Sequence, residues 1–123
     1  MSLTKPEIDF PGGEPPVELQ IRDIVVGDGA EAKAGAMVEV HYVGVTFASG
    51  EEFDASWNRG QTFRFPLGGG RVIKGWDQGV QGMKVGGRRE LIIPPNMAYG
   101  NQSPSPLIPP GSTLIFVVDL LGV

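Results

Sequence analysis

The residue types that most often carry covalent or metal chemistry are scarce in this sequence. It has no cysteine, so thiol nucleophiles and cysteine-based metal sites are excluded. Its one histidine, His41, lies at a polar position of an alternating segment, where a solvated or structural role is favoured over a catalytic one. Glu51, Glu52 and Asp54 lie close together, but no calcium-loop periodicity follows them. We therefore expect neither a metal nor a cofactor.

Two basic or glycine-rich segments also admit simple structural interpretations. Three consecutive glycines at 68–70 precede Arg71 and suggest a phosphate-binding loop, yet neither phosphate-loop pattern is completed and no long helix follows. We interpret them as a tight turn before a helix. We interpret Arg88 and Arg89 as the solvated edge of a strand.

Six of the ten aromatic residues come from six different segments of the chain. They are Tyr42, Phe53, Phe63, Trp76, Tyr99 and Phe116. Two interpretations are open, that the rings form the core or that they line a pocket. Asp54 and Arg59 flank the set, and a charged pair beside many rings is typical of the polar rim of an apolar pocket. Buried tyrosine and tryptophan also require partners for their O–H and N–H groups.

The elements that must position these rings are mostly strands. Alternating or continuous apolar runs predict strands at 17–26, 37–47, 88–93 and 112–121, with shorter extended segments at 53–56 and 63–65. The strand at 112–121 is apolar on both faces, which indicates a central position. Ile73, Trp76 and Val80 have helical spacing and predict one short helix over 73–80. Because Gly75 and Gly79 weaken its propensity, packing must stabilise it.

A long segment without regular structure is predicted at 94–111, which holds six of the eleven prolines. Loops of this length in compact domains are usually functional or disordered. This one contains Tyr99, Leu107 and Ile108, large apolar residues that a disordered tail would not need. We therefore interpret the segment as one wall of a site.

Composition and length indicate a single globular domain. The chain has 123 residues, of which 41% are hydrophobic and 20% charged. The 19 glycines and 11 prolines favour a β-rich fold with many turns. The predicted fold class is α+β, an antiparallel β-sheet wrapped around one short α-helix. We expect an extended N-terminal arm at 1–16, anchored by Ile8 and Phe10, and a folded domain at 17–123.

Charge and hydropathy limit the partners and the location. The net charge is −4 and no long block of like charges occurs, so we expect no nucleic-acid partner. No run of about 18 apolar residues is present, so we expect no membrane span. Residues 1–16 resemble neither a secretory signal nor a transit peptide, and we expect a monomer in the cytoplasm.

Six short motifs, in this order, resemble the FKBP family, the peptidyl-prolyl cis/trans isomerases that bind the macrolides tacrolimus and rapamycin. They are VHYVG at 40–44, EFDAS at 52–56, VIKGWDQG at 72–79, AYG at 98–100, IPP at 108–110 and LIF at 114–116. The resemblance covers about residues 17–121, and the short segment at 100–107 is similar to that of the minimal single-domain members. Many members carry a histidine before the IPP turn, where this chain has Ser-Pro-Ser-Pro at 103–106.

The resemblance implies a catalytic pocket with defined residues. The catalytic set would be Tyr42, Phe53, Asp54, Trp76, Tyr99 and Phe116. Further ligand contacts would come from Arg59, Phe63, Val72, Ile73 and Ile108. Trp76 would form the floor beneath the substrate proline, the Ile73 N–H and the Tyr99 hydroxyl would bind substrate carbonyls, and Asp54 would pair with Arg59. Ile108 would close the rim.

The resemblance further implies an activity, the isomerisation of Xaa-Pro bonds in proline-containing polypeptides during folding. An apolar pocket would desolvate the amide and bind its twisted form, and macrolides would occupy the same pocket. A non-catalytic module that binds proline segments or macrolides is the alternative hypothesis. A third is an interaction domain in which every ring belongs to the core.

Overall fold

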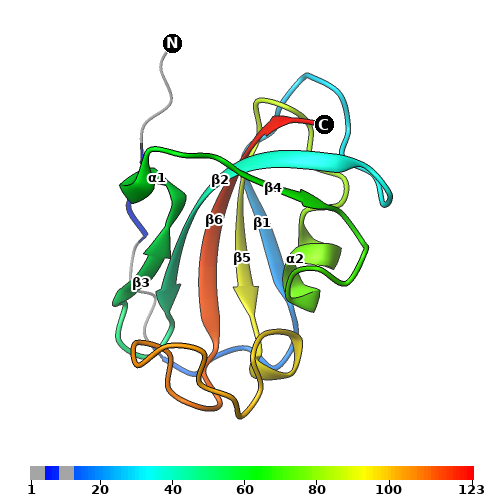
Figure 1. Cartoon of the computed structure of the whole chain (residues 1–123). Helices are drawn as coiled ribbons and strands as arrows, with labels where there is room; N and C mark the ends of the chain where they lie inside the picture. Colours follow the sequence, from blue (N-terminus) through cyan, green and yellow to red (C-terminus); the bar gives the residue numbers. More distant parts are fainter. Residues whose placement is uncertain (1–4, 9–12) are drawn as a thin grey trace.

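The computed structural model describes residues 5–8 and 13–123, and its main element is a strongly curved antiparallel sheet (Figure 1). The strands are β1 (Gln20–Val25), β2 (Met37–Thr46), β3 (Glu52–Ala55), β4 (Phe63–Pro66), β5 (Arg88–Ile93) and β6 (Leu114–Gly122). Their order is β1-β5-β6-β2-β3, and β4 pairs with β2. The antiparallel sheet and the central position of β6 confirm the predictions.

Helical structure is limited to short segments. They are α1 (Ser56–Arg59), α2 (Lys74–Gly79) and the 3-10 turn η1 (Pro95–Met97). The expected helix over 73–80 is confirmed, since Ile73 and Val80 cap α2. The prediction of one helix was incomplete, because the segment expected to stay extended after Phe53 turns into α1 at Ser56. One helical turn is too short to produce a hydrophobic period in the sequence.

The core lies between the concave face of the sheet and α2. Alternate residues of β2, Val38, Val40 and Tyr42, point into it, as the period of two requires. α2 approaches β5 so closely that a Cβ added to Gly75 would lie 2.5 Å from Ile93 Cγ2. The two glycines of α2 therefore lower its intrinsic propensity but allow the contact that holds it on the sheet.

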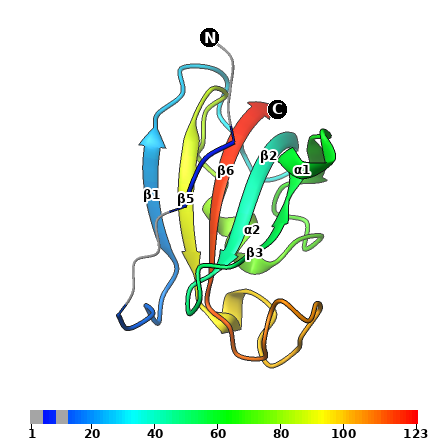
Figure 2. The same ribbon diagram turned by 90° about the vertical axis from the view of Figure 1, so that its left-hand side faces the viewer.

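Residues 5–8 of the N-terminal arm lie over the opposite face of the sheet (Figure 2). Ile8 packs against a second apolar cluster formed by Val45, Phe47 and Ile115. Lys5 forms an ion pair with Glu52 at 2.8 Å. Ile8 is thus an anchor, as predicted, whereas Phe10 lies outside the described residues. The domain boundary at residue 16 stays a prediction.

The interpretation of Arg88 and Arg89 as a solvated edge was wrong. Arg88 Nε lies 2.7 Å from Oδ1 of the buried Asp119 on β6. Arg89 Nε lies 2.7 Å from Asp23 Oδ1 on β1, and its Nη1 donates to the carbonyl of Gly79. Both arginines are held because β5 lies between β1 and β6, a placement that a local pattern does not reveal.

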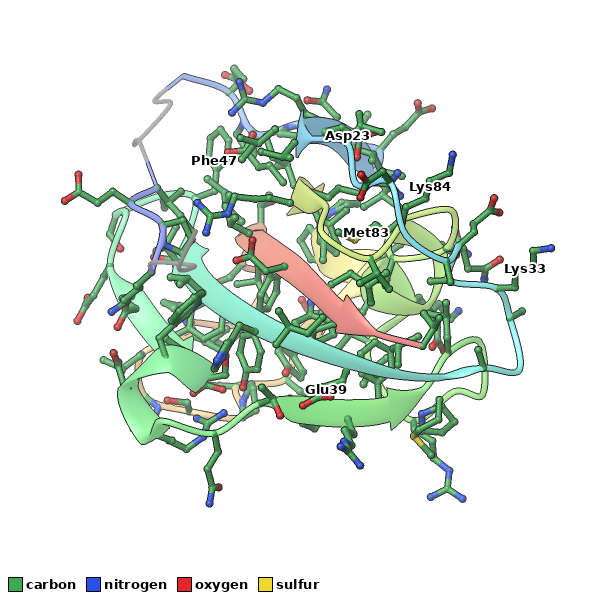
Figure 3. The ribbon with its side chains drawn as sticks, turned by 90° about the horizontal axis from the view of Figure 1, so that it is seen from above. Asp23, Lys33, Glu39, Phe47, Met83 and Lys84 are labelled. Carbon is green, nitrogen blue, oxygen red and sulfur yellow. The ribbon has the colours of Figure 1, made fainter. Side chains whose placement is uncertain are left out.

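The three glycines at 68–70 form a turn before α2, as expected. The backbone N–H groups of Gly68 and Gly70 each donate to the Asp77 carboxylate at 2.9 Å. No helix in the described part of the chain is long and apolar enough to cross a membrane. Lys33 and Lys84 project outward from the connecting loops (Figure 3).

Candidate functional site

A cavity of about 430 Å³ opens beside α2 and is walled mainly by aromatic and aliphatic side chains. The lining residues are Tyr42, Phe53, Asp54, Phe63, Arg71, Val72, Ile73, Trp76, Tyr99 and Phe116. All the residues predicted for the pocket are in this set except Arg59 and Ile108. They come from β2, β3, β4, α2, β6 and two loops, so only the tertiary fold brings them together.

The rings pack mainly edge to face around Trp76, which is 4% exposed. Its ring centroid lies 5.0 Å from that of Tyr42 and 5.2 Å from that of Phe116, with interplanar angles of 78° and 86°. Edge-to-face pairs at such distances are favourable because a positive ring edge meets a negative ring face. The two interpretations of the aromatic set are therefore compatible, since the same rings are core residues and cavity walls.

A glycine on β2 permits the arrangement of two of these walls. Phe53 and Phe116 meet edge to face across β2, with their centroids 5.5 Å apart. A Cβ added at Gly44 would lie 2.6 Å from Phe53 Cζ and 2.7 Å from Phe116 Cε1. Only a residue without a side chain lets both rings approach the strand so closely.

The polar rim is a hydrogen-bonded group of three side chains. The Tyr42 hydroxyl donates to Asp54 Oδ2 at 2.6 Å, and Arg59 Nη1 donates to Asp54 Oδ1 at 2.6 Å. Arg59 Nη2 donates to the Tyr42 hydroxyl at 2.9 Å. Arg59 thus reaches the site through Asp54 and Tyr42 without lining the cavity, and both carboxylate oxygens of Asp54 are occupied.

The protonation states of this group follow from its contacts. Burial acts to raise the Asp54 pKa, but the hydrogen bonds from Tyr42 and Arg59 outweigh it and lower the pKa below its ordinary value. Burial raises the pKa of Tyr42, and the hydrogen bond to Asp54 raises it further. At neutral pH Asp54 is therefore charged and compensated by Arg59, while Tyr42 keeps its proton.

The group is held on the sheet by Ser56, a residue that sequence reasoning did not select. Its buried Oγ accepts the Tyr42 N–H at 2.7 Å and lies 2.8 Å from His41 Nδ1. The His41 ring stacks on Trp57, with centroids 4.1 Å apart. His41 is therefore structural, as favoured above, and fastens the start of α1 to β2. The sequence signal was the place of Ser56 at the end of the EFDAS motif at 52–56.

Two hydrogen-bond donors at the cavity have no partner within the described residues. These are the backbone N–H of Ile73, directly before α2, and the hydroxyl of Tyr99. Burial raises the Tyr99 pKa, and the charge of Asp54 raises it further, so this hydroxyl remains a donor at neutral pH. Both donors can bind carbonyl oxygens of a ligand that enters the cavity.

Ile108 and Arg71 differ from their predicted positions. Ile108 is buried in the main core cluster and is not among the lining residues, although Tyr99 from the same long loop is. Arg71 lines the cavity, whereas the sequence analysis named it only as the residue that follows the glycine turn. Its position directly before the predicted pocket residues Val72 and Ile73 was the signal that could have identified it.

The chemistry available in the cavity is binding and desolvation. The described lining residues include no histidine, cysteine, serine or lysine, so they contain no nucleophile with an adjacent base. They offer apolar walls and two free donors, which suit an apolar ring that carries carbonyl groups on either side.

Comparisons with known proteins identify close relatives. A family model described as FKBP-type peptidyl-prolyl cis-trans isomerase matches residues 29–121. The chain is 66% identical over 124 residues to the FK506-binding protein of Streptomyces anulatus, covering 100% of both chains. It is 58% identical over 121 residues to the probable FK506-binding protein of Corynebacterium glutamicum, covering 98% of this chain and 99% of that one.

Solved structures agree with the sequence comparisons. The crystal structure of AtFKBP13 superposes with a TM-score of 0.77 at 44% identity, covering 85% of this chain and 91% of that one. FkpA from Escherichia coli gives a TM-score of 0.74 at 43% identity, covering 84% of this chain and 46% of that one. This chain is therefore similar to both proteins in sequence as well as in fold.

Proposed function

The chain belongs to the FKBP-type peptidyl-prolyl cis-trans isomerase family, and we propose that it catalyses rotation about Xaa-Pro bonds of polypeptides. The observation that carries the proposal is the aromatic cavity with two unpartnered donors, the Ile73 N–H and the Tyr99 hydroxyl. An aromatic wall can accept the proline ring while the two donors bind the carbonyls beside it.

The reaction suits a cavity without a nucleophile. Rotation about a peptide bond breaks amide resonance, with a barrier of about 18–20 kcal/mol, and no covalent bond is made or broken. The planar amide is more polar than the twisted one, so water stabilises the ground state more. A dry, apolar cavity removes that advantage and favours the twisted form. Lowering the barrier by about 5–6 kcal/mol would accelerate rotation roughly 10⁴-fold.

We assign each group a role in this mechanism. Trp76, buried at the centre of the rings, is the floor beneath the proline, and Tyr42, Phe53, Phe63 and Phe116 are the walls that exclude water. Asp54 and Arg59 order the rim through Tyr42 and transfer no proton. Val72 completes the wall beside α2.

Macrolides of the tacrolimus and rapamycin type are proposed ligands of the same cavity. The support is the similarity to proteins named for FK506 binding, together with the apolar lining. We further propose that the protein acts as a monomer in the cytoplasm, on polypeptides that are still folding.

A protease-free isomerisation assay tests the proposal. Tetrapeptides with Leu before proline should isomerise faster than those with Glu, because the aromatic walls extend beyond the proline ring. Rapamycin should abolish the acceleration of both the Leu and the Glu peptides, and a metal chelator should change neither rate. Equal rates for Leu-Pro and Glu-Pro would contradict this cavity as the site. Rapamycin binding without any acceleration would instead identify a non-catalytic module.

A further inference from the structure

Only two charged residues line the cavity among the residues that the structure describes, Asp54 and Arg71. Asp54 has both oxygens engaged by Tyr42 and Arg59. Arg71 has no ion pair within the described residues, and it is exposed. The cavity therefore presents one charged group that is free to meet a charge on a ligand.

The charges on the neighbouring elements leave a small positive excess beside Arg71. Glu52 on β3 is neutralised by its ion pair with Lys5. Asp77 on α2 keeps its negative charge, because the N–H groups of Gly68 and Gly70 that it accepts are neutral. Lys74, at the start of α2, is a second exposed cation without an ion pair in the described chain and offsets Asp77. The charge of Arg71 is therefore not cancelled on this side of the cavity, although the whole chain carries a net charge of −4.

The solvent exposure of the lining residues indicates where along the cavity Arg71 lies. Trp76 is buried, Val72 and Ile73 are half-buried, and Arg71 is exposed, so the lining progresses from floor to mouth along this segment. An extended peptide advances about 3.3 Å per residue. A proline seated on Trp76 would thus bring a residue outside the Xaa-Pro pair to the mouth, where Arg71 lies.

We propose that Arg71 is a specificity-determining residue that binds a carboxylate on the residue directly before or directly after the Xaa-Pro pair. The preferred substrates are then proline-containing segments with a flanking Asp or Glu. This inference rests on the proposed isomerase function and names the substrate class of the same site. A guanidinium suits this task because it stays charged and can bind a carboxylate with two parallel hydrogen bonds.

The test compares Leu-Pro peptides that carry either Glu or its neutral analogue Gln at one flanking position. One pair places the variable residue directly before Leu and the other directly after proline. For at least one pair, kcat/KM should be about two- to five-fold higher with Glu, the range expected for a solvent-exposed ion pair. The ratio should approach one in 1 M salt, because the Debye length then falls to about 3 Å.

The Arg71→Gln variant should bring the Glu-to-Gln ratio close to one, and Arg71→Glu should bring it below one. Arg64→Gln is the matched control, since it removes the same charge from an arginine on β4 that is 69% exposed and pairs with Glu39. It should keep the wild-type ratio. Because each ratio compares two peptides on one enzyme preparation, it does not depend on the fraction of the variant that is folded.

Two results would overturn the inference while leaving the proposed function intact. One is a wild-type ratio near one at both flanking positions, with Leu-Pro peptides still isomerised. The other is a Glu preference that persists unchanged in Arg71→Gln or is lost equally in Arg64→Gln. If wild-type protein accelerates no peptide of the set, the proposed function itself fails, and this inference fails with it.

Discussion

Asp54 is the only acidic side chain among the described residues that line the cavity, which makes it the obvious candidate for proton transfer. Its contacts argue for a different role. The Tyr42 hydroxyl and the Arg59 guanidinium occupy both carboxylate oxygens and lower the Asp54 pKa. A catalytic acid or base needs a pKa near the working pH, and Asp54 is shifted away from that range. It is better suited to ordering the rim.

We predict that isomerisation is nearly independent of pH between about pH 5.5 and 8. The ordinary Asp pKa is about 3.9, and a lowered value keeps Asp54 ionised throughout this range. The raised pKa values of Tyr42 and Tyr99 keep both hydroxyls protonated in the same range. Any stabilisation from the Asp54 contacts is present above its unfolded pKa and is lost only as the pH falls through the lowered one.

We also predict that Asp54→Asn lowers the rate in the protease-free isomerisation assay only a few-fold, because the substitution weakens one polar contact of the rim and removes no catalytic proton.

Phe116→Ala is the comparison that decides between the two roles of Asp54. Phe116 is a buried wall, and its removal opens the cavity to water, so this variant should lose more activity than Asp54→Asn. Both variants must first be shown to be folded by near-ultraviolet circular dichroism. An inactive Asp54→Asn beside an active Phe116→Ala would overturn the desolvation mechanism in favour of proton transfer.

At the scale of elements, α2 illustrates a conflict between propensity and packing. Its six residues include Gly75 and Gly79, each about 1 kcal/mol less favourable than alanine in a helix interior. Both glycines face β5, where added Cβ atoms would lie 2.5 Å from Ile93 Cγ2 and 2.7 Å from Leu91 Cδ2. Ile93 and Leu91 are fully buried, so moving either side chain would disturb the core around it. The close approach of α2 to the sheet also sets the depth of Trp76.

We predict that Gly75→Ala destabilises the protein by about 1–3 kcal/mol, the usual cost of overpacking a core. Propensity alone would give the opposite sign. Urea denaturation measures the difference, with Gln78→Ala, on the exposed side of the same helix, as control. The control should stay within about 0.5 kcal/mol of the wild type. A stabilised Gly75→Ala would mean that α2 does not approach β5 as closely as described.

At the scale of the whole molecule, one buried ion pair links the central strands. Arg88 on β5 and Asp119 on β6 are paired at 2.7 Å, and Asp119 lies opposite His41 of β2 in the register. The side chain of Asp119 is 2% exposed, and its Oδ2 has no hydrogen-bond partner among the described residues. Burial raises the Asp119 pKa, while Arg88 acts to lower it. Losing one partner would leave a buried charge uncompensated.

We predict that Arg88→Met costs about 3–5 kcal/mol of unfolding free energy at neutral pH. Without Arg88 the folded-state pKa of Asp119 should rise further above its unfolded value of about 3.9. The loss of stability relative to the wild type should therefore be smallest below that unfolded pKa and grow as the pH rises through the folded one, where Asp119 becomes charged without its partner. Thermal melts from pH 3 to 8 measure this dependence.

Arg22→Met is the matched control for this experiment. Arg22 pairs with Glu90 at 3.3 Å, but its side chain is 69% exposed, so the loss should be at most about 1 kcal/mol. Equal losses in the two variants would show that burial of the Arg88–Asp119 pair has no special energetic role.

Much of this protein could be predicted from its sequence because the relevant signals are local. Alternation in 37–47 and the doubly apolar run near the C-terminus indicated β2 and the central β6. The spacing of Ile73, Trp76 and Val80 indicated α2. The six motifs indicated the family, and the comparisons agree with it. Each of these signals lies within a short stretch of chain, where side-chain periodicity follows directly from backbone geometry.

The remainder depended on contacts between residues far apart in the chain. The local sequence predicted solvated side chains for Arg88 and Arg89. Both are instead paired with carboxylates on neighbouring strands, because β5 lies between β6 and β1. Ile108 entered the core and Arg71 the cavity lining because the fold, rather than the local pattern, sets the depth of each loop residue. The sequence around a charged residue is the same whether its side chain pairs with a residue on a neighbouring strand or projects into water. Only the tertiary structure determines which side chains meet, because pairing and burial are properties of the assembled sheet.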